Sequence, residues 1–144
     1  MAKIILVTGA TSGFGRAIAI KFAGHGWDCI ITGRRAGKLT ELAAQLEEHH
    51  KVRVLPLNFD VRDKKEVFRQ LGDLPPDWRS IQLLVNNAGL ALGRETFDEA
   101  FIEDWETMID TNLKGLLYVS KAIIPYFIQQ GRGHIINLGS TAAK

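Results

Sequence analysis

A glycine-rich segment near the start of the chain constrains its fold most strongly. The apolar run Ile4–Val7 leads into this segment, residues 8–15, and a stretch with helical spacing of apolar side chains, residues 16–23, follows directly. This order predicts a strand, a tight turn and a helix. The first N–H groups of a helix have no partner within it and point outward with the positive end of its dipole, so the turn is a candidate site for a phosphate or diphosphate.

The glycines of this turn each have a steric reason to be there. We expect Gly9 to make the tight turn, Gly13 to let a diphosphate approach the backbone, and Gly15 to let the helix pack closely on the strand. The spacing G-x-x-x-G-x-G is not the commoner G-x-G-x-x-G, and no G-K-[ST] ending places a lysine on a terminal phosphate. Similar turns also join strands to helices in proteins that bind nothing. The candidate binding residues here are Gly9, Ala10, Thr11, Ser12, Gly13, Phe14 and Gly15.

Strands and helices alternate along the rest of the chain. The pattern predicts strands at about 3–8, 28–32, 52–57, 81–85 and 134–138, and helices at about 14–24, 36–49, 63–71 and 103–130. Asp63 and Glu66 form a D-x-x-E capping pair for the third helix, and Pro125 is expected to bend the fourth. This alternation predicts an α/β fold with a doubly wound, Rossmann-like parallel sheet, in one domain over residues 1–144.

Further short motifs follow the other predicted strands. They are Arg34-Arg35, Asp60-Val61, Asn86-Asn87-Ala88-Gly89 and Ser140. Because ligands of doubly wound sheets bind beyond the carboxyl ends of the strands, where the strand order reverses, we expect these motifs to share one site with the glycine turn. Taken alone, each has a simpler explanation: Asp60 as a helix cap, Arg34 and Arg35 as a solvated helix start, and the other two as strand-ending turns.

With these motifs in place, the chain resembles the short-chain dehydrogenase/reductase family. The resemblance covers all 144 residues and rests on Thr8-Gly9-x-x-x-Gly13-x-Gly15, Asp60-Val61, Asn86-Asn87-Ala88-Gly89, Asn112 and Ser140. It implies reversible hydride transfer between the nicotinamide C4 of a bound cofactor and an alcohol or carbonyl carbon. Segments 32–35, 86–93 and 103–112 are similar to those of NADP-dependent enzymes that oxidise serine, allo-threonine and related 3-hydroxy acids, so the implied partner is a small-molecule substrate.

The resemblance also implies roles for individual residues. Asp60 and Val61 would contact the adenine of the dinucleotide. The segment Asn86, Asn87, Ala88 and Gly89 would hold the central sheet and line the nicotinamide ribose. Ser140 would bind the substrate and hydrogen-bond its reacting oxygen. The long helix would offer a face to a second subunit in a dimer or tetramer.

Asn112 is assigned to the catalytic machinery by the same resemblance, in which the matching asparagine bends its helix and holds a water. It lies at helical spacing from Trp105, Met108, Ile109 and Leu116, so it is predicted to place a polar amide on an otherwise apolar face. An amide buried there without a partner would cost roughly 1 to 3 kcal/mol. The alternative is an ordinary core asparagine whose hydrogen bonds are satisfied.

Arg34 and Arg35 indicate which cofactor is bound. The end of the second strand is where NAD-dependent enzymes place an acid against the adenosine 2′-hydroxyl, and here Gly33 and two arginines stand instead. Guanidinium groups suit a 2′-phosphate in charge and in bidentate geometry. The predicted cofactor is therefore NADP.

One part of the family pattern is missing. These enzymes carry Tyr-x-x-x-Lys after the serine, but Tyr118 is followed four residues later by Ala122 and Tyr126 by Gln130, and both tyrosines precede Ser140. We therefore expect the chain to be the cofactor-binding part of an enzyme whose C-terminal part is absent, and to be inactive alone. Two alternatives stay open: a non-catalytic dinucleotide-binding module, or an assembly protein that binds no ligand.

Composition excludes some classes of binding partner. A net charge of +2 with no basic stripe argues against nucleic acid, and no apolar run approaches the roughly 18 residues that a membrane span needs. No secretory signal precedes the first strand, so we expect a cytoplasmic protein. The single cysteine, Cys29, is predicted to be a buried thiol. The four histidines show no metal-binding spacing.

Overall fold

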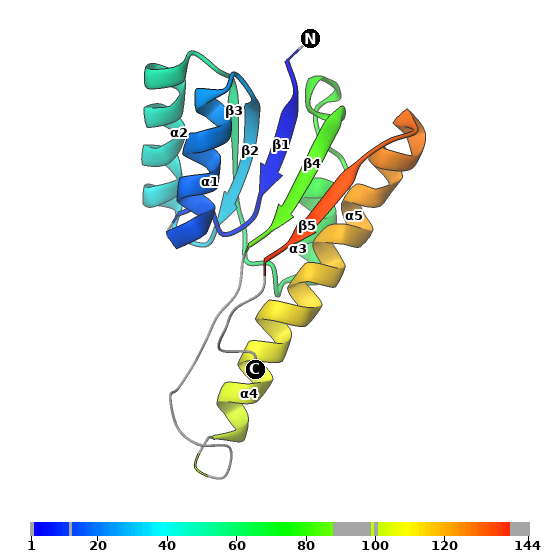
Figure 1. The fold of residues 1–144 in the computed structure, drawn as a ribbon. Helices are drawn as coiled ribbons and strands as arrows, with labels where there is room; N and C mark the ends of the chain where they lie inside the picture. Colours follow the sequence, from blue (N-terminus) through cyan, green and yellow to red (C-terminus); the bar gives the residue numbers. More distant parts are fainter. Residues whose placement is uncertain (1, 12, 88–98, 100, 139–144) are drawn as a thin grey trace.

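Five parallel strands form the centre of the molecule, in the order β3-β2-β1-β4-β5 (Figure 1). The computed structural model describes residues 2–11, 13–87, 99 and 101–138. The strands are β1 (Ile4–Val7), β2 (Asp28–Gly33), β3 (Val54–Asn58), β4 (Ile81–Asn86) and β5 (His134–Asn137). The chain winds outward from β1 to β2 and β3, then returns to the other side of β1 with β4 and β5. The doubly wound parallel sheet predicted from the sequence is therefore confirmed, with the reversal of strand order between β1 and β4.

Helices cover both faces of the sheet, so the strands are apolar on both sides. Alternate residues of β1 enter different cores: Ile5 and Val7 pack with α1 and α2, whereas Ile4 and Leu6 pack with α3 and α5. All four side chains are at most 2% exposed. Burying each of them contributes roughly 1.5 to 3 kcal/mol, which makes β1 the anchor of both layers. The helices of the first layer are α1 (Gly13–Gly24) and α2 (Ala36–His50), and those of the second are α3 (Lys64–Leu71) and α5 (Gly115–Gln130).

The predicted cap of α3 is present. Asp63 precedes the helix, and its carboxylate accepts a hydrogen bond from the Glu66 backbone N–H at 3.2 Å. A short 3₁₀ turn, η1 (Pro76–Trp78), then leads to β4. Cys29 is a buried free thiol, also as predicted. Burial, with the neighbouring Asp28 charge, raises the pKa of Cys29 to about 12.

The long C-terminal helix differs from the prediction of a single helix over 103–130. It consists of α4 (Ile102–Met108), a π-helical segment η2 (Ile109–Lys114) and α5. Its lower part projects beyond the sheet (Figure 1). The predicted apolar face is buried only in part: Ile123 and Phe127 belong to the core, whereas Ile109, Leu113, Leu117 and Ile124 are exposed. No helix in the described part of the chain has the length and apolar character to cross a membrane.

Candidate functional site

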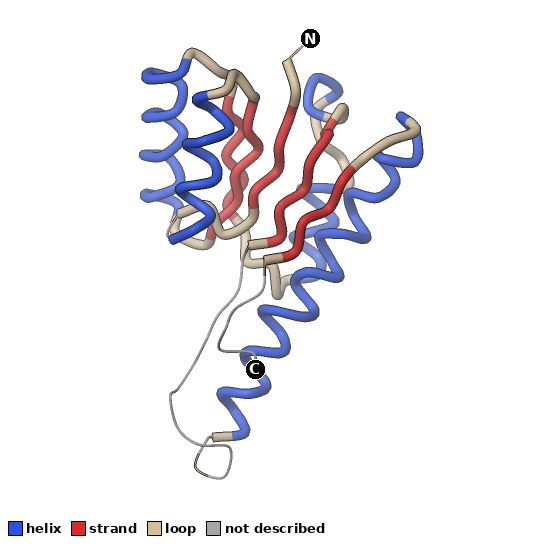
Figure 2. The backbone as a smooth tube through the Cα atoms, viewed as in Figure 1, coloured by secondary structure: helices blue, strands red, loops and turns tan. Residues whose placement is uncertain are grey.

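A cavity of about 260 Å³ lies at the carboxyl ends of β1, β2, β3 and β4, where the strand order reverses. The loops that follow β1, β2 and β3 gather at this edge of the sheet, beside the end of β4 (Figure 2). The volume is close to the lower end of small-molecule sites, roughly 300 to 1,000 Å³. The cavity is lined by Gly9, Thr11, Gly13, Phe14, Thr32, Gly33, Arg34, Arg35, Phe59, Asp60, Val61, Asn87 and Thr111. The structure thus brings together motifs that lie far apart in the sequence.

The glycine turn forms one wall of this cavity. Gly9 and Gly13 have φ values of 62° and 58°, in the left-handed region that glycine adopts without strain. A Cβ built on Gly13 would have no atom within 4 Å, so the backbone at the start of α1 faces open space. Phe14, beside it, is 78% exposed and also lines the cavity, whereas Ala10 is fully buried beneath the turn. Ser12 lies outside the described residues.

The structural reason for a glycine at position 15 differs from the predicted one. A Cβ at this position would collide with the Gly9 carbonyl oxygen and the Asn87 side-chain amide. The close approach is therefore between the first turn of α1, the glycine turn and the end of β4, rather than between the helix and a strand.

Asn87 connects the end of β4 to the glycine turn. Its backbone N–H donates to Thr8 Oγ1 at 3.0 Å, and its Nδ2 donates to the Gly9 carbonyl at 2.9 Å. Its neighbour Asn86 connects three elements, since Nδ2 donates to Ser120 Oγ on α5 at 3.1 Å and to Asn137 Oδ1 on β5 at 2.9 Å. These bonds join the end of β4 to β5, to α5 and to the glycine turn. Ala88 and Gly89 lie outside the described residues.

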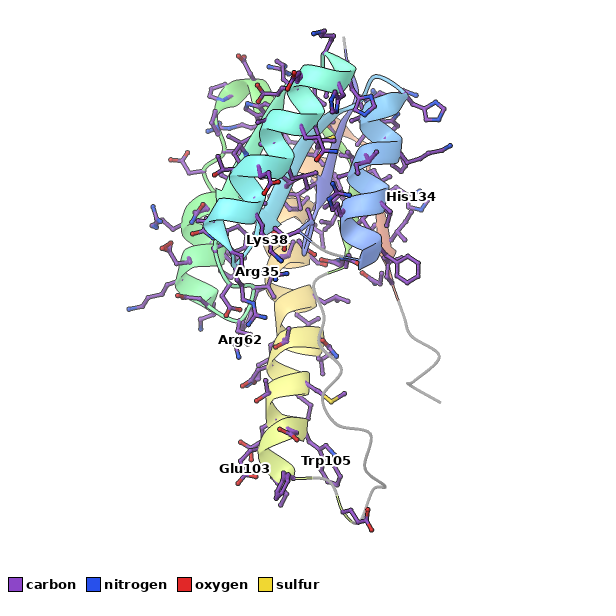
Figure 3. All side chains as sticks on the ribbon, turned by 90° about the vertical axis from the view of Figure 1, so that its left-hand side faces the viewer. Arg35, Lys38, Arg62, Glu103, Trp105 and His134 are labelled. Carbon is purple, nitrogen blue, oxygen red and sulfur yellow. The ribbon has the colours of Figure 1, made fainter. Side chains whose placement is uncertain are left out.

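Arg34 and Arg35 are exposed and line the cavity between the end of β2 and the start of α2. Figure 3 shows Arg35 at the end of α2 that faces this edge of the sheet. Arg35 precedes α2 without a side-chain capping bond. Two cations at the amino end of a helix are disfavoured by its dipole, so the helix itself gives no reason for them.

Asp60 does not cap α3, because Asp63 does so; its carboxylate binds Arg62 instead. Oδ1 accepts from the Arg62 backbone N–H at 2.9 Å and from Nε at 3.1 Å, and Oδ2 accepts from Nε at 3.0 Å and Nη2 at 2.7 Å. Partial burial acts to raise the pKa of Asp60, but the hydrogen bonds and charge of Arg62, with the charge of Arg34, hold that pKa below its ordinary value. Asp60 therefore faces the cavity as an ionised group.

The sequence reasoning missed Arg62. The signal for it is an aspartate that follows a strand with an arginine two residues later, a spacing that lets one side chain turn back onto the other. The pattern is short and common, so it does not identify a site without the fold.

The second wall of the cavity joins the turn after β3 to the long helix. Val61 is buried, and a Cβ built on Gly115 would lie 2.6 Å from Val61 Cγ2. Thr111, in η2, lines the cavity, but the next residue, Asn112, is exposed. Asn112 therefore lies in the helical irregularity. Because it is exposed, neither the cost of a buried amide nor the alternative of a core asparagine applies to it. Ser140 lies outside the described residues.

Comparison with known proteins places this geometry in a family context. The profile of the short chain dehydrogenase family matches residues 3–144. An NADP-dependent 3-hydroxy acid dehydrogenase, YdfG, of Salmonella typhi is 51% identical over 139 residues, which cover 96% of this chain and 54% of that protein. Sulfoacetaldehyde reductase 2 of Chromohalobacter salexigens is 50% identical over 145 residues, covering 100% and 57%.

A solved structure is similarly close. The closed form of serine dehydrogenase complexed with NADP⁺ superimposes with a TM-score of 0.86 at 48% identity, covering 97% of this chain and 55% of that one. The chain spans about half the length of the curated relatives that it matches.

Proposed function

The chain belongs to the short-chain dehydrogenase family, and from this premise we propose that it binds NADP and forms part of an oxidoreductase. The reaction would be reversible hydride transfer between NADP and the hydroxyl or carbonyl carbon of a small substrate, a 3-hydroxy acid such as serine. Support for the substrate class comes from the names of the relatives, an NADP-dependent 3-hydroxy acid dehydrogenase and a serine dehydrogenase.

The single observation that carries the proposal is the cavity at the strand-order reversal, with a glycine turn on one wall and two arginines on another. The open space at Gly13 accepts a diphosphate against the exposed N–H groups at the start of α1. Thr11, Phe14 and Gly15 belong to the same turn. Ala10 and Ser12 are also proposed as binding residues, on the basis of the sequence. The residues of this cavity fit the diphosphate half of NADP.

The adenosine half of NADP would lie toward β2 and β3. Arg34 and Arg35 would bind the 2′-phosphate, and Asp60 and Val61 would contact the adenine. A charge-assisted hydrogen bond of roughly 1.5 to 3 kcal/mol gives on the order of a ten- to hundredfold preference for NADP over NAD. Asn87, with Ala88 and Gly89, would lie on the nicotinamide side.

Bound NADP would supply the hydride acceptor of the reaction. We propose that Ser140 holds the reacting oxygen of the substrate and that Asn112 holds a water near it. The 144 residues contain no Tyr-x-x-x-Lys to move the proton. These residues by themselves are therefore expected to bind NADP without oxidising an alcohol.

We further propose that the protein is a cytoplasmic homo-oligomer. The location is supported by the single cysteine, which leaves no pair for a disulfide within the chain. Oligomerisation is supported by a row of exposed apolar side chains along α4, η2 and α5. These are Ile102, Ile109, Leu113, Leu117, Ile124 and Ile128.

The test is a titration of the purified chain with NADPH and with NADH, repeated on the variant Arg34→Ala with Arg35→Ala. Because the two guanidinium groups face only the 2′-phosphate in this proposal, the variant is expected to lose about ten- to a hundredfold in NADPH affinity and less than about threefold in NADH affinity. Equal losses for the two cofactors would make the arginines general surface charge. Failure of the unaltered chain to bind either cofactor would reject the proposed function.

A further inference from the structure

The negative charge of Asp60 is electrostatically unfavourable in a cavity that binds a phosphate-rich cofactor. Its side chain lines the cavity and is 28% exposed. A free carboxylate at this place would repel the phosphates of the ligand. Arg62 removes this problem, because three of its N–H groups engage both carboxylate oxygens at 2.7 to 3.1 Å.

The pairing also leaves the carboxylate able to accept a further hydrogen bond. A carboxylate has about four lone-pair positions. Arg62 brings three N–H groups to them, with Nε shared between Oδ1 and Oδ2, so these three donors leave the carboxylate able to accept a fourth. A carboxylate accepts hydrogen bonds and donates none, so its partner in the cavity must carry an N–H or O–H group. Among the parts of NADP, the phosphates offer neither, whereas the adenine amino group, the ribose hydroxyls and the nicotinamide amide can all donate.

Position selects the adenine end of the cofactor. Asp60 follows β3, and β3 pairs with β2, which ends at Gly33 beside Arg34. The charge of Arg34 acts on the Asp60 carboxyl, so the two side chains share one corner of the cavity. If Arg34 takes the 2′-phosphate, the adenine attached to the same ribose lies within reach of Asp60.

We propose that Arg62 is a positioning residue for cofactor recognition: it neutralises the Asp60 carboxylate and fixes it so that the carboxylate accepts one further hydrogen bond, from the adenine amino group. This inference rests on the proposed NADP site. Arg62 is not among the residues lining the cavity and acts through Asp60. Figure 3 shows its side chain at the same edge of the molecule as Arg35.

The chain offers a matched control on α3. Arg69 pairs with Glu66 through Nε–Oε2 at 2.5 Å and Nη2–Oε1 at 2.9 Å, the same bidentate chemistry as in the Asp60 pair. Neither residue lines the cavity. Arg69→Gln therefore removes the same kind of ion pair and the same charge without touching the carboxylate in the cavity.

The experiment compares the binding of NADP with that of its hypoxanthine counterpart, in which oxygen replaces the adenine amino group. The unaltered chain is expected to prefer NADP by about tenfold, as for one charge-assisted hydrogen bond. In Arg62→Gln, NADP affinity is expected to fall about tenfold and the preference to shrink to within about twofold. Arg69→Gln is expected to leave both affinities and the preference unchanged.

Arg62→Lys separates the two parts of the role, since lysine keeps the charge but lacks the planar fork. It should restore the affinity for the hypoxanthine cofactor without restoring the preference for adenine. Thermal unfolding of each variant shows whether it is folded at the temperature of the titration, and the lysine variant carries the test if the glutamine variant is not.

Equal weakening of both cofactors in Arg62→Gln, an unchanged preference in either variant, or no preference in the unaltered chain would overturn the role of Arg62 while leaving NADP binding intact. Absence of NADP binding by the unaltered chain would reject the proposed function, and this inference with it.

Discussion

Gly13 and Gly15 are two residues apart, yet a side chain would act differently at each. At Gly13 the surroundings are open and φ is 58°, so a larger residue meets no protein atom but strains the backbone. At Gly15 a Cβ would meet the Gly9 carbonyl and the Asn87 amide. The first glycine therefore leaves room for a ligand, whereas the second leaves room for the protein itself.

This contrast predicts separable effects on binding and stability. Gly13→Val is expected to abolish NADPH binding, because its side chain occupies the diphosphate position, and to lower the free energy of unfolding by about 1 to 2 kcal/mol, the cost of a left-handed residue. Gly15→Ala is expected to destabilise the chain more, because backbone must move. Urea unfolding and NADPH titration measure both quantities. NADPH affinity equal to that of the unaltered chain in a folded Gly13→Val variant would remove this glycine from the site.

The sequence was sufficient to predict the roles of some single residues but not of others. The open role of Gly13 could be predicted because it depends on local geometry at a helix start. The contact at Gly15 could not, because Asn87 is 72 positions away and reaches it only through the pairing of β1 with β4. The role of Asp60 was ambiguous for a similar reason: two aspartates precede α3, and only the structure shows that Asp63 caps the helix while Asp60 turns to Arg62.

The second wall of the cavity depends on the junction between η2 and α5. A Cβ on Gly115 would lie 2.6 Å from Cγ2 and 3.0 Å from Cβ of the buried Val61. Because Val61 is fixed in the core next to Asp60, this contact sets how closely the helix approaches the side of the cavity that Asp60 and Val61 line.

Gly115→Ala is accordingly expected to lower the free energy of unfolding by about 1 to 3 kcal/mol, the usual cost of overpacking. Gly37→Ala is the control: Gly37 lies in α2, has no atom within 4 Å of a built Cβ, and should gain up to about 1 kcal/mol from helix propensity. Thermal unfolding followed by circular dichroism compares the two. A Gly115→Ala variant as stable as the unaltered chain would show that the helix is not held against Val61.

Most elements could be predicted to within one or two residues because apolar runs and helical periodicity are properties of neighbouring residues. The clearest failure is η2. A six-residue π-helical segment, Ile109–Lys114, changes the local period too briefly to alter the apolar pattern, and its position coincides with the contact at Gly115. The exposure of Ile109, Leu113 and Leu117 was missed because an apolar pattern in the sequence does not show which neighbour, if any, covers that face.

At the scale of the whole molecule, the sheet brings the turns after four strands to one edge, and the opposite edge carries unrelated contacts. There the Asp28 carboxylate accepts from the Arg53 backbone N–H at 2.8 Å and from its Nε at 3.0 Å, and Arg53 lies over the Trp78 ring. We propose that a dinucleotide binds at the first edge. The two edges can be distinguished in one experiment, because each has its own reporter residues.

The most direct test is the change in backbone amide NMR signals when NADP is added to the chain. We expect the signals of Gly9, Gly13, Arg34, Asp60 and Asn87 to shift with a common saturation curve, while those of Asp28 and Arg53 stay in place. Shifts confined to α5 or spread evenly over both edges, or no saturable shift at all, would show that NADP does not bind in this cavity.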